Sequence, residues 1–185
     1  GTVSGAGSFD YNTSAAITAT PATGHTFAGW TGAGVAATNS ATTTVSMTQD
    51  RNVSASFTIN SYALTLAVGT GGTVSGSGTY THGSDANVTA TPATGYKFTG
   101  WTGAGAADAN AASTTVSMTQ ARSLTANFTK KTYTLAISGG TGGTTTGSGT
   151  FEHGTDANVS ATPSTGYVFA GWSGAGVADI NASTT

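Results

Sequence analysis

The sequence predicts an all-β protein, built as a tandem array of small repeat domains of 71 residues. The first observation is an internal repeat: the segment around Trp30 recurs around Trp101 and Trp172, each time 71 residues further along. The second is a short alternation of apolar with small or polar residues, which is the period of a half-buried strand. The third is that no long segment places apolar residues at helical spacing, in a chain whose 28 glycines disfavour helices.

The repeat spacing divides the chain into repeat 1 (residues 1–61), repeat 2 (62–132) and repeat 3 (133–185). Repeat 2 is complete. Repeat 1 has no counterpart of residues 62–71 and so lacks the first strand, whereas repeat 3 has no counterpart of residues 115–128 and lacks the last strands. Because the terminal repeats of an array normally carry adapted caps, we expect this chain to be an excerpt of a longer array.

The elements of repeat 2 follow from its local patterns. From Tyr62 onward, large apolar residues alternate with small or polar ones, and the glycines at 69–72 end this strand. Pro92 and Gly95 mark a turn, because proline presets φ and glycine closes the reversal. The most aromatic strand then ends at Trp101, before a loop of small residues at 102–112. The predicted strands are 62–68, 73–75, 79–82, 86–91, 96–101, 114–118 and 123–128.

Each repeat is small for an independent domain, so its few large apolar side chains must supply most of its core. In repeat 2 the predicted core residues are Tyr62, Leu64, Leu66, Val88, Phe98, Trp101 and Phe128.

The composition excludes several classes of function. Only 6% of the residues are charged, and the formal net charge is −2. Five Lys and Arg cannot form a basic surface along a phosphate backbone, so we expect no nucleic-acid partner. No apolar run is long enough to cross a bilayer, so we expect no membrane insertion in this segment. Without Cys, a thiol nucleophile and a Cys-ligated zinc site are both impossible.

Acid–base chemistry has one candidate pair, His82 with Asp85, which recurs in repeat 3 as His153 with Asp156. A His–Asp pair without a nucleophile or third partner is weak evidence for catalysis, so we expect these side chains to cap turns. The carboxylates are also too dispersed for a calcium loop. We therefore predict no catalytic residue, no metal site and no cofactor, and a protein that is not an enzyme.

Two sets of residues are candidates for binding or modification. Trp30, Trp101 and Trp172 could stack on sugar rings, with the repetition raising avidity, although a role in closing the core of each small unit is favoured. The Asn-x-Ser/Thr pattern makes candidate glycosylation sites of Asn12, Asn52, Asn87, Asn127, Asn158 and Asn181.

The pattern of repeat 2 resembles the divergent internalin B-repeat family, which is related to the Listeria–Bacteroides repeat. The resemblance covers the whole period in all three repeats, although His25 stands where the other repeats have Tyr. It implies small β-grasp-like modules in secreted or surface-anchored bacterial proteins, acting as stalks or spacers and in some cases in adhesion. It implies no enzymatic site. The segments that carry it are Tyr62-x-Leu64-x-Leu66, Gly71-Gly72-Thr-Val, Ala90-Thr-Pro-x-x-Gly95-Tyr-x-Phe98-x-Gly-Trp101 and Leu124-x-Ala-x-Phe128.

We therefore expect a non-enzymatic structural segment of an exported bacterial protein, forming a stalk or adhesive fibre at the cell surface or outside the cell. One alternative is a subunit of a self-assembling extracellular filament, because natural edge strands are usually protected by Lys or Pro and this chain has few of either. The other is a carbohydrate-binding repeat array. The expected partners are neighbouring repeats, with copies of the chain, a surface glycan or a host protein as further candidates.

Overall fold

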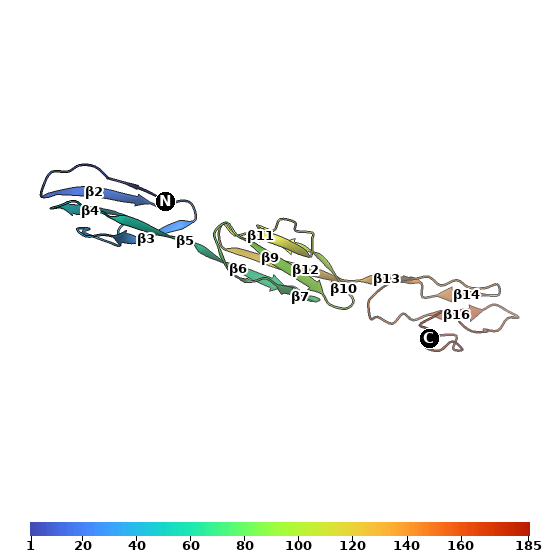
Figure 1. Ribbon diagram of the computed structural model, residues 1–185. Coiled ribbons are helices and arrows are strands. Elements are labelled where there is room, and N and C mark those ends of the chain that lie inside the picture. Colours follow the sequence, from blue (N-terminus) through green and yellow to red (C-terminus); the bar gives the residue numbers. More distant parts are fainter. The chain divides into compact units, whose positions relative to one another are not determined.

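The structure is a computed structural model that describes residues 1–185, and it contains sixteen strands and no helix (Figure 1). The all-β class expected from the sequence is confirmed. No stretch of helix has the length and apolarity that crossing a membrane requires. The β-grasp-like arrangement that the family resemblance implies stays a prediction.

Repeat 2 forms two sheets. In the first, the strand order is β10-β12-β6-β8, with β12 parallel to β6 and Leu124 opposite Leu66. In the second, the order is β11-β9-β7, with β11 antiparallel to β9 and Thr114 opposite Val88. These strands lie where the alternation predicted them. Their bounds are β6 Ser61–Val68, β7 Gly72–Ser75, β8 Gly78–Thr81, β9 Asp85–Pro92, β10 Tyr96–Thr102, β11 Ser113–Ser117 and β12 Arg122–Lys130.

The core of repeat 2 differs in part from the predicted one. Leu64, Val88 and Trp101 are buried as expected. The predicted core residues Tyr62, Leu66, Phe98 and Phe128 are only half-buried. The rings of Phe98 and Phe128 pack edge to face, with centroids 5.8 Å apart, and each keeps part of its surface in solvent.

The most buried side chains at the centre of this core come from β11, from Met118 directly after it, and from β12, and the prediction missed several of them. Val116 and Met118 are 0% exposed, and Leu124 is 1% exposed. Ala86, Val88 and Ala90 of β9 are buried as well. Alternation gives each strand an inward face. Only the pairing of the strands determines which of these faces lies at the centre.

Repeat 1 has the same two-sheet construction with fewer strands. One sheet has the order β1-β2-β4, and the other pairs β3 with β5. Its buried core consists of Ala15, Ile17, Ala19, Trp30 and Val45. The segment 7–10, which corresponds to β8, is not a strand, because β8 pairs with β6 and repeat 1 has no counterpart of β6. The bounds are β1 Thr2–Ser4, β2 Thr13–Thr20, β3 His25–Thr31, β4 Thr42–Met47 and β5 Ser54–Ile59.

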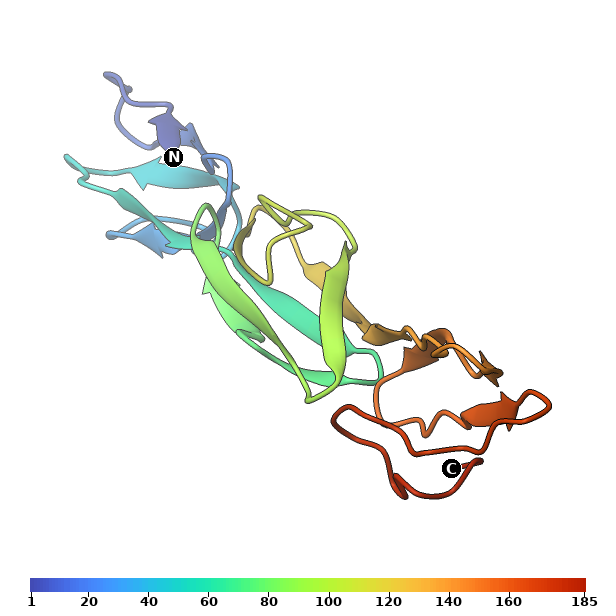
Figure 2. The same ribbon diagram turned by 90° about the vertical axis from the view of Figure 1, so that its right-hand side faces the viewer.

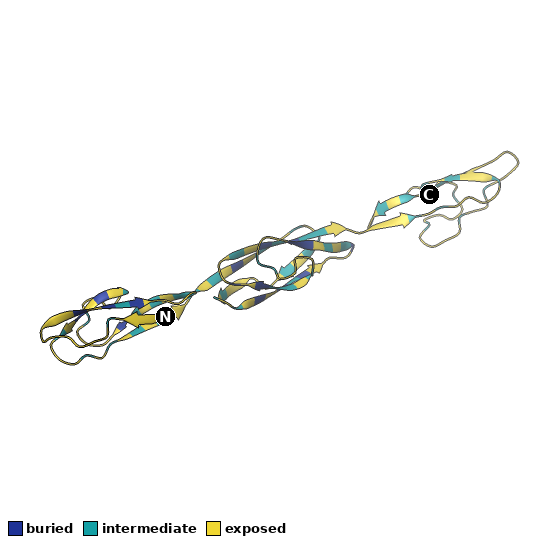
Figure 3. Cartoon of the chain, turned by 90° about the horizontal axis from the view of Figure 1, so that it is seen from above, coloured by how far each residue is buried: buried dark blue, intermediate teal, exposed yellow.

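Repeat 3 forms two antiparallel strand pairs, β13 with β15 and β14 with β16, and one isolated antiparallel bridge between Ser160 and Thr184. None of residues 133–185 is buried (Figure 3). Residues 167–172 match the most aromatic strand of the other repeats, yet here they form a coil, drawn in red in Figure 2. In repeat 1 the matching strand β3 pairs with β5, and repeat 3 has no counterpart of β5. The bounds are β13 Thr132–Leu135, β14 Gly143–Thr146, β15 Gly149–Glu152 and β16 Ser160–Pro163.

The two leucines Leu64 and Leu135 occupy the same repeat position but differ in burial, since Leu64 is 2% exposed and Leu135 is half-buried. We expect Leu64→Ala to lower the free energy of unfolding of repeat 2 by about 2–5 kcal/mol, because it leaves a cavity in a closed core. Leu135→Ala should cost repeat 3 only about 1 kcal/mol. Hydrogen exchange of the amides of β12 and β15, which pair with the two mutated strands, measures both losses. Equal losses would contradict the burial difference.

Candidate functional site

The three tryptophans hold the loop that follows them. Each indole N–H donates to a backbone carbonyl ten residues further on, and all three N···O distances are 3.0 Å. Trp30 and Trp101 are 5% and 4% exposed, so neither ring has a free face on which a sugar could stack. Trp172 makes the same hydrogen bond but is half-exposed. The hydrogen bond is therefore local, whereas burial of the ring depends on strands that repeat 3 does not form.

In the candidate acid–base pair of His82 and Asp85, Nδ1 of His82 is buried and has no hydrogen-bond partner, so this atom is not paired with Asp85. Turn-capping falls instead to other carboxylates: Oδ1 of Asp108 accepts from the amide of Asn110 at 2.8 Å, and Asp179 caps Asn181 at 2.9 Å. No three His, Asp or Glu side chains gather into a group that could hold a metal ion.

Five of the six sequon asparagines are exposed, and Asn127 on β12 is half-buried. Asn12 lies in a turn at a φ of 64°, a left-handed conformation that Asn tolerates better than most residues. Asn87 lies on β9 with its side chain outward, between the buried Ala86 and Val88. As glycosylation sites they stay a prediction.

A single residue connects the last strand of one repeat to the first strand of the next. β5 ends at Ile59 and β6 begins at Ser61, so Asn60 alone links repeats 1 and 2. Its amide donates to the carbonyl of Gly24 at 2.8 Å, and its carbonyl accepts from the amide of His82 at 2.8 Å. The linking residue thus has both its backbone groups paired, which restricts rotation about the link. We call this arrangement joint 1.

The ring of His82 completes joint 1. It packs against Tyr62 with ring centroids 5.9 Å apart. It also lies so close over Gly24, at the turn of repeat 1, that a Cβ added there would overlap it. Gly24 is required for two reasons: its φ is +72°, and any side chain would displace the histidine. Sequence reasoning missed this contact, because nothing in the pattern shows that position 82 of one repeat meets position 24 of the previous one.

Joint 2 repeats this construction around Lys131, Gly95 and His153. The amide of Lys131 donates to the carbonyl of Gly95 at 2.7 Å, and its carbonyl accepts from the amide of His153 at 2.8 Å. The His153 ring packs on Tyr133 with centroids 6.0 Å apart and lies over Gly95.

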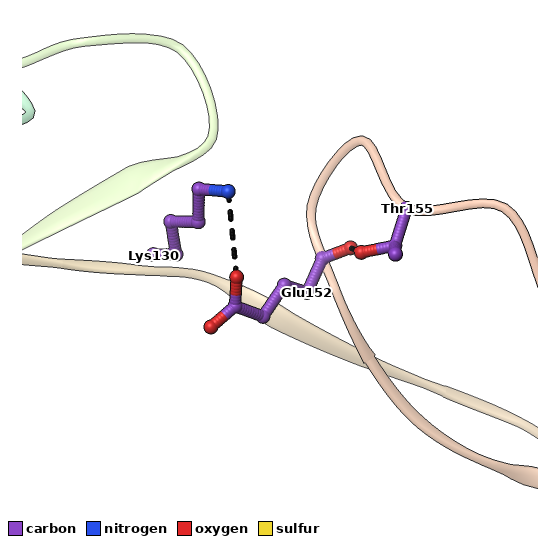
Figure 4. Close-up of polar contacts among 3 residues, drawn as sticks. All are labelled: Lys130, Glu152 and Thr155. Carbon is purple, nitrogen blue, oxygen red and sulfur yellow. Dashed lines mark hydrogen bonds and ion pairs between the residues drawn. The ribbon is translucent and has the colours of Figure 1, made fainter.

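An exposed ion pair borders joint 2 (Figure 4). Nζ of Lys130 lies 3.3 Å from a carboxylate oxygen of Glu152, with the two side chains 44% and 61% exposed. The hydroxyl of Thr155 donates to the carbonyl of Glu152 at 2.6 Å and holds the following turn. Because the ion pair is exposed and screened by solvent, it adds little to the stability of the joint.

Repeat 3 carries an uncovered apolar surface, which we call the open face. It surrounds a cavity of about 1040 Å³. Val168 is 88% exposed there, and Phe169 and Trp172 are half-buried. The residues that define the open face are Val159, Ala161, Val168, Phe169, Trp172 and Val177.

Comparison with known protein families identifies the family of the chain. A family model described as the divergent InlB B-repeat domain matches residues 1–61, 62–132 and 133–185, and so covers the whole chain. The family is found in bacterial surface proteins. No curated protein and no solved structure matches the chain significantly.

The contact between His153 and Gly95 in joint 2 can be tested with Gly95 and Gly166, which occupy the same position in repeats 2 and 3. Both Gly95 and Gly166 have a positive φ, of +78° and +84°, so alanine at either position costs about 1–2 kcal/mol of backbone strain. Only the Cβ at position 95 would meet the ring of His153, since nothing lies within 4 Å at position 166. We expect Gly95→Ala to shift the NMR resonances of the His153 ring and to cost about 1–3 kcal/mol more than Gly166→Ala. The double variant with His153→Ala should recover most of that difference. Equal costs for Gly95→Ala and Gly166→Ala would contradict the contact.

Proposed function

We infer a structural role from the fact that the chain belongs to the divergent InlB B-repeat family. We propose that it is a non-enzymatic segment of an exported bacterial surface protein, and that it acts as a spacer or stalk with one copy of the same surface in each repeat. Its role is mechanical: each repeat adds length and is joined to the next by a single linking residue.

The observation that carries this proposal is the construction of the joints. A flexible array would connect its repeats by several unpaired polar or glycine residues. Here one residue forms each link, both of its backbone groups are hydrogen-bonded, and a histidine ring packs on the glycine of the preceding turn. Asn60 is held further, because its Oδ1 accepts from the hydroxyl of Thr26 at 2.6 Å. A joint of this kind supports a spacer, because it resists bending between repeats.

The surface of the repeats also supports a spacer. The outward positions of the strands are dominated by Ser and Thr, as in β2 and β4, with few charges. Hydroxyl side chains keep a β-surface solvated without attracting ions or charged partners. Neither Trp30 nor Trp101 has an exposed ring, so a carbohydrate-binding array gains no support from the tryptophans.

Lengthening the chain by one repeat tests the proposed spacer role. A second copy of residues 62–132 inserted after residue 132 reproduces the joint around Lys131. We expect the radius of gyration measured by small-angle scattering to rise by roughly a third, because a spacer grows in proportion to its repeat number. A compact arrangement would grow only by about an eighth, and that result would contradict the proposal. A control with a flexible Gly-Ser linker in place of Lys131 should instead broaden the distribution of dimensions.

A second candidate is a subunit of a self-assembling extracellular filament. It is favoured by the small number of Lys and Pro residues in the chain, because these residues usually protect edge strands from pairing with other chains. Electron microscopy across a concentration series separates the two functions. The spacer predicts single molecules at every concentration, whereas the filament predicts ordered fibres above a threshold concentration.

A further inference from the structure

We propose that the complete repeat is a force-bearing unit, in which the parallel strands β6 and β12 act as a mechanical clamp. Tension along the array loads this pair in shear, so the repeat stays folded under a pull that opens strand pairs loaded from one end. This role deepens the proposed spacer function and rests on it, because a chain segment bears tension only when it connects two attached points.

Tension reaches the two clamp strands directly, because they are the first and the last strand of the repeat. Asn60 alone connects β6 to repeat 1, and Lys131 alone connects β12 to repeat 3. Both linking residues have their backbone amide and carbonyl hydrogen-bonded. No flexible segment therefore lies between the load and the strands that carry it.

The register of the pair places the two loaded points at opposite ends of the paired segment. β12 runs parallel to β6, with residues 122–126 opposite residues 64–68 (Figure 1). The load enters β6 at Ser61, before the paired segment begins, and leaves β12 at Lys130, after the segment ends. A pull on these two points slides the strands past each other along their length. Because the hydrogen bonds of a parallel pair are evenly spaced, they share the load and must break together.

The clamp is also shielded from water. In its sheet, β12 lies between β10 and β6, and β6 lies between β12 and β8, so neither clamp strand is an edge strand. Leu64 of β6 and Leu124 and Ala126 of β12 are buried on the inward side. Water satisfies the groups of a broken backbone hydrogen bond only where it reaches the strand, and an unpaired buried group is costly. Burial therefore raises the resistance of the clamp to shear.

The other two repeats lack such a clamp within residues 1–185. Every strand pair of repeats 1 and 3 is antiparallel, and none joins the first strand of the repeat to its last. An antiparallel pair that is pulled from neighbouring ends opens one hydrogen bond at a time, because each bond in turn carries the whole load. Repeat 2 is therefore the unit of this chain that we expect to resist tension longest.

Pulling the folded chain from two different pairs of points tests the clamp. The chain has no Cys, so introduced cysteines give unique attachment points for the handles. Ser61→Cys with Thr129→Cys loads β6 and β12 at opposite ends and applies shear. Ser61→Cys with Gln120→Cys loads the same two strands at neighbouring ends and peels them apart. All three positions are exposed, so both variants keep the core of the repeat intact.

Forced unfolding is governed by the unfolding rate, so the lifetime at constant force in optical tweezers is the quantity to measure. We expect the shear variant to stay folded at least about a hundredfold longer than the peeling variant, because several hydrogen bonds must break in one step. Its rupture should release residues 64–126, which adds a length of roughly 200 Å. Chemical denaturation, which has no direction, should give both variants the same stability. Equal lifetimes in the two geometries would overturn the clamp.

Two core variants, studied in the shear geometry, separate the clamp from general stability. Leu124→Ala truncates a buried side chain of the clamp strand β12, whereas Met118→Ala truncates a buried side chain directly after β11, which belongs to the other sheet. Both should lower the equilibrium stability by similar amounts. Only Leu124→Ala should shorten the lifetime under shear, by at least about tenfold, because contacts outside the clamp are still intact when it breaks. Equal shortening by both variants would mean that the whole core sets the lifetime, and would overturn the proposal.

The clamp and the spacer fail in different experiments. A compact arrangement of the lengthened chain in scattering contradicts the spacer, and the two pulling geometries still report on the clamp within repeat 2. Equal lifetimes in the two geometries, together with the expected growth in radius of gyration, remove the clamp and leave the spacer.

Discussion

The structure of the complete repeat depends on one long-range pairing, that of its last strand with the strands formed much earlier in the chain. In repeat 2 this strand is β12, which lies between β10 and β6 and runs parallel to β6. It brings Leu124 and Ala126 into the core. Such a pairing joins residues distant in sequence, so it forms only after a large loss of chain entropy and then stabilises several strands at once.

Within residues 1–185, repeats 1 and 3 each contain only one side of this pairing. Repeat 1 has the strand that corresponds to β12 but not the one that corresponds to β6, and its segment 7–10 forms no strand. Repeat 3 has the opposite deficit, and its aromatic segment 167–172 forms no strand although its residues favour one. Strand propensity alone is therefore insufficient in this fold. A segment becomes a strand only where a neighbour satisfies its backbone groups.

The same strand also connects the repeats. β12 continues through Lys131 into β13, and β5 continues through Asn60 into β6, so the strand that closes one core leads directly into the next. The link is held by the glycine of the Pro-x-x-Gly turn. Its carbonyl accepts a hydrogen bond from the amide of the linking residue, and a histidine ring of the next repeat packs against it. The turn that the sequence predicted as a chain reversal therefore also contacts the next repeat. This contact supports the proposed role as a spacer.

The sequence by itself determined the all-β class, the 71-residue repetition, the positions of the strands in repeat 2 and the family resemblance, because these depend on local alternation, on turn residues and on self-similarity. It also favoured a core position for Trp30, Trp101 and Trp172, since a small core needs its largest side chains. Trp30 and Trp101 are buried, whereas Trp172 is only half-buried. Only the tertiary structure decided that Met118, Leu124 and Val116 are among the largest fully buried side chains, and that His82 packs on Gly24. These features depend on which strand meets which, and such pairings join residues whose separation in sequence leaves no local signal.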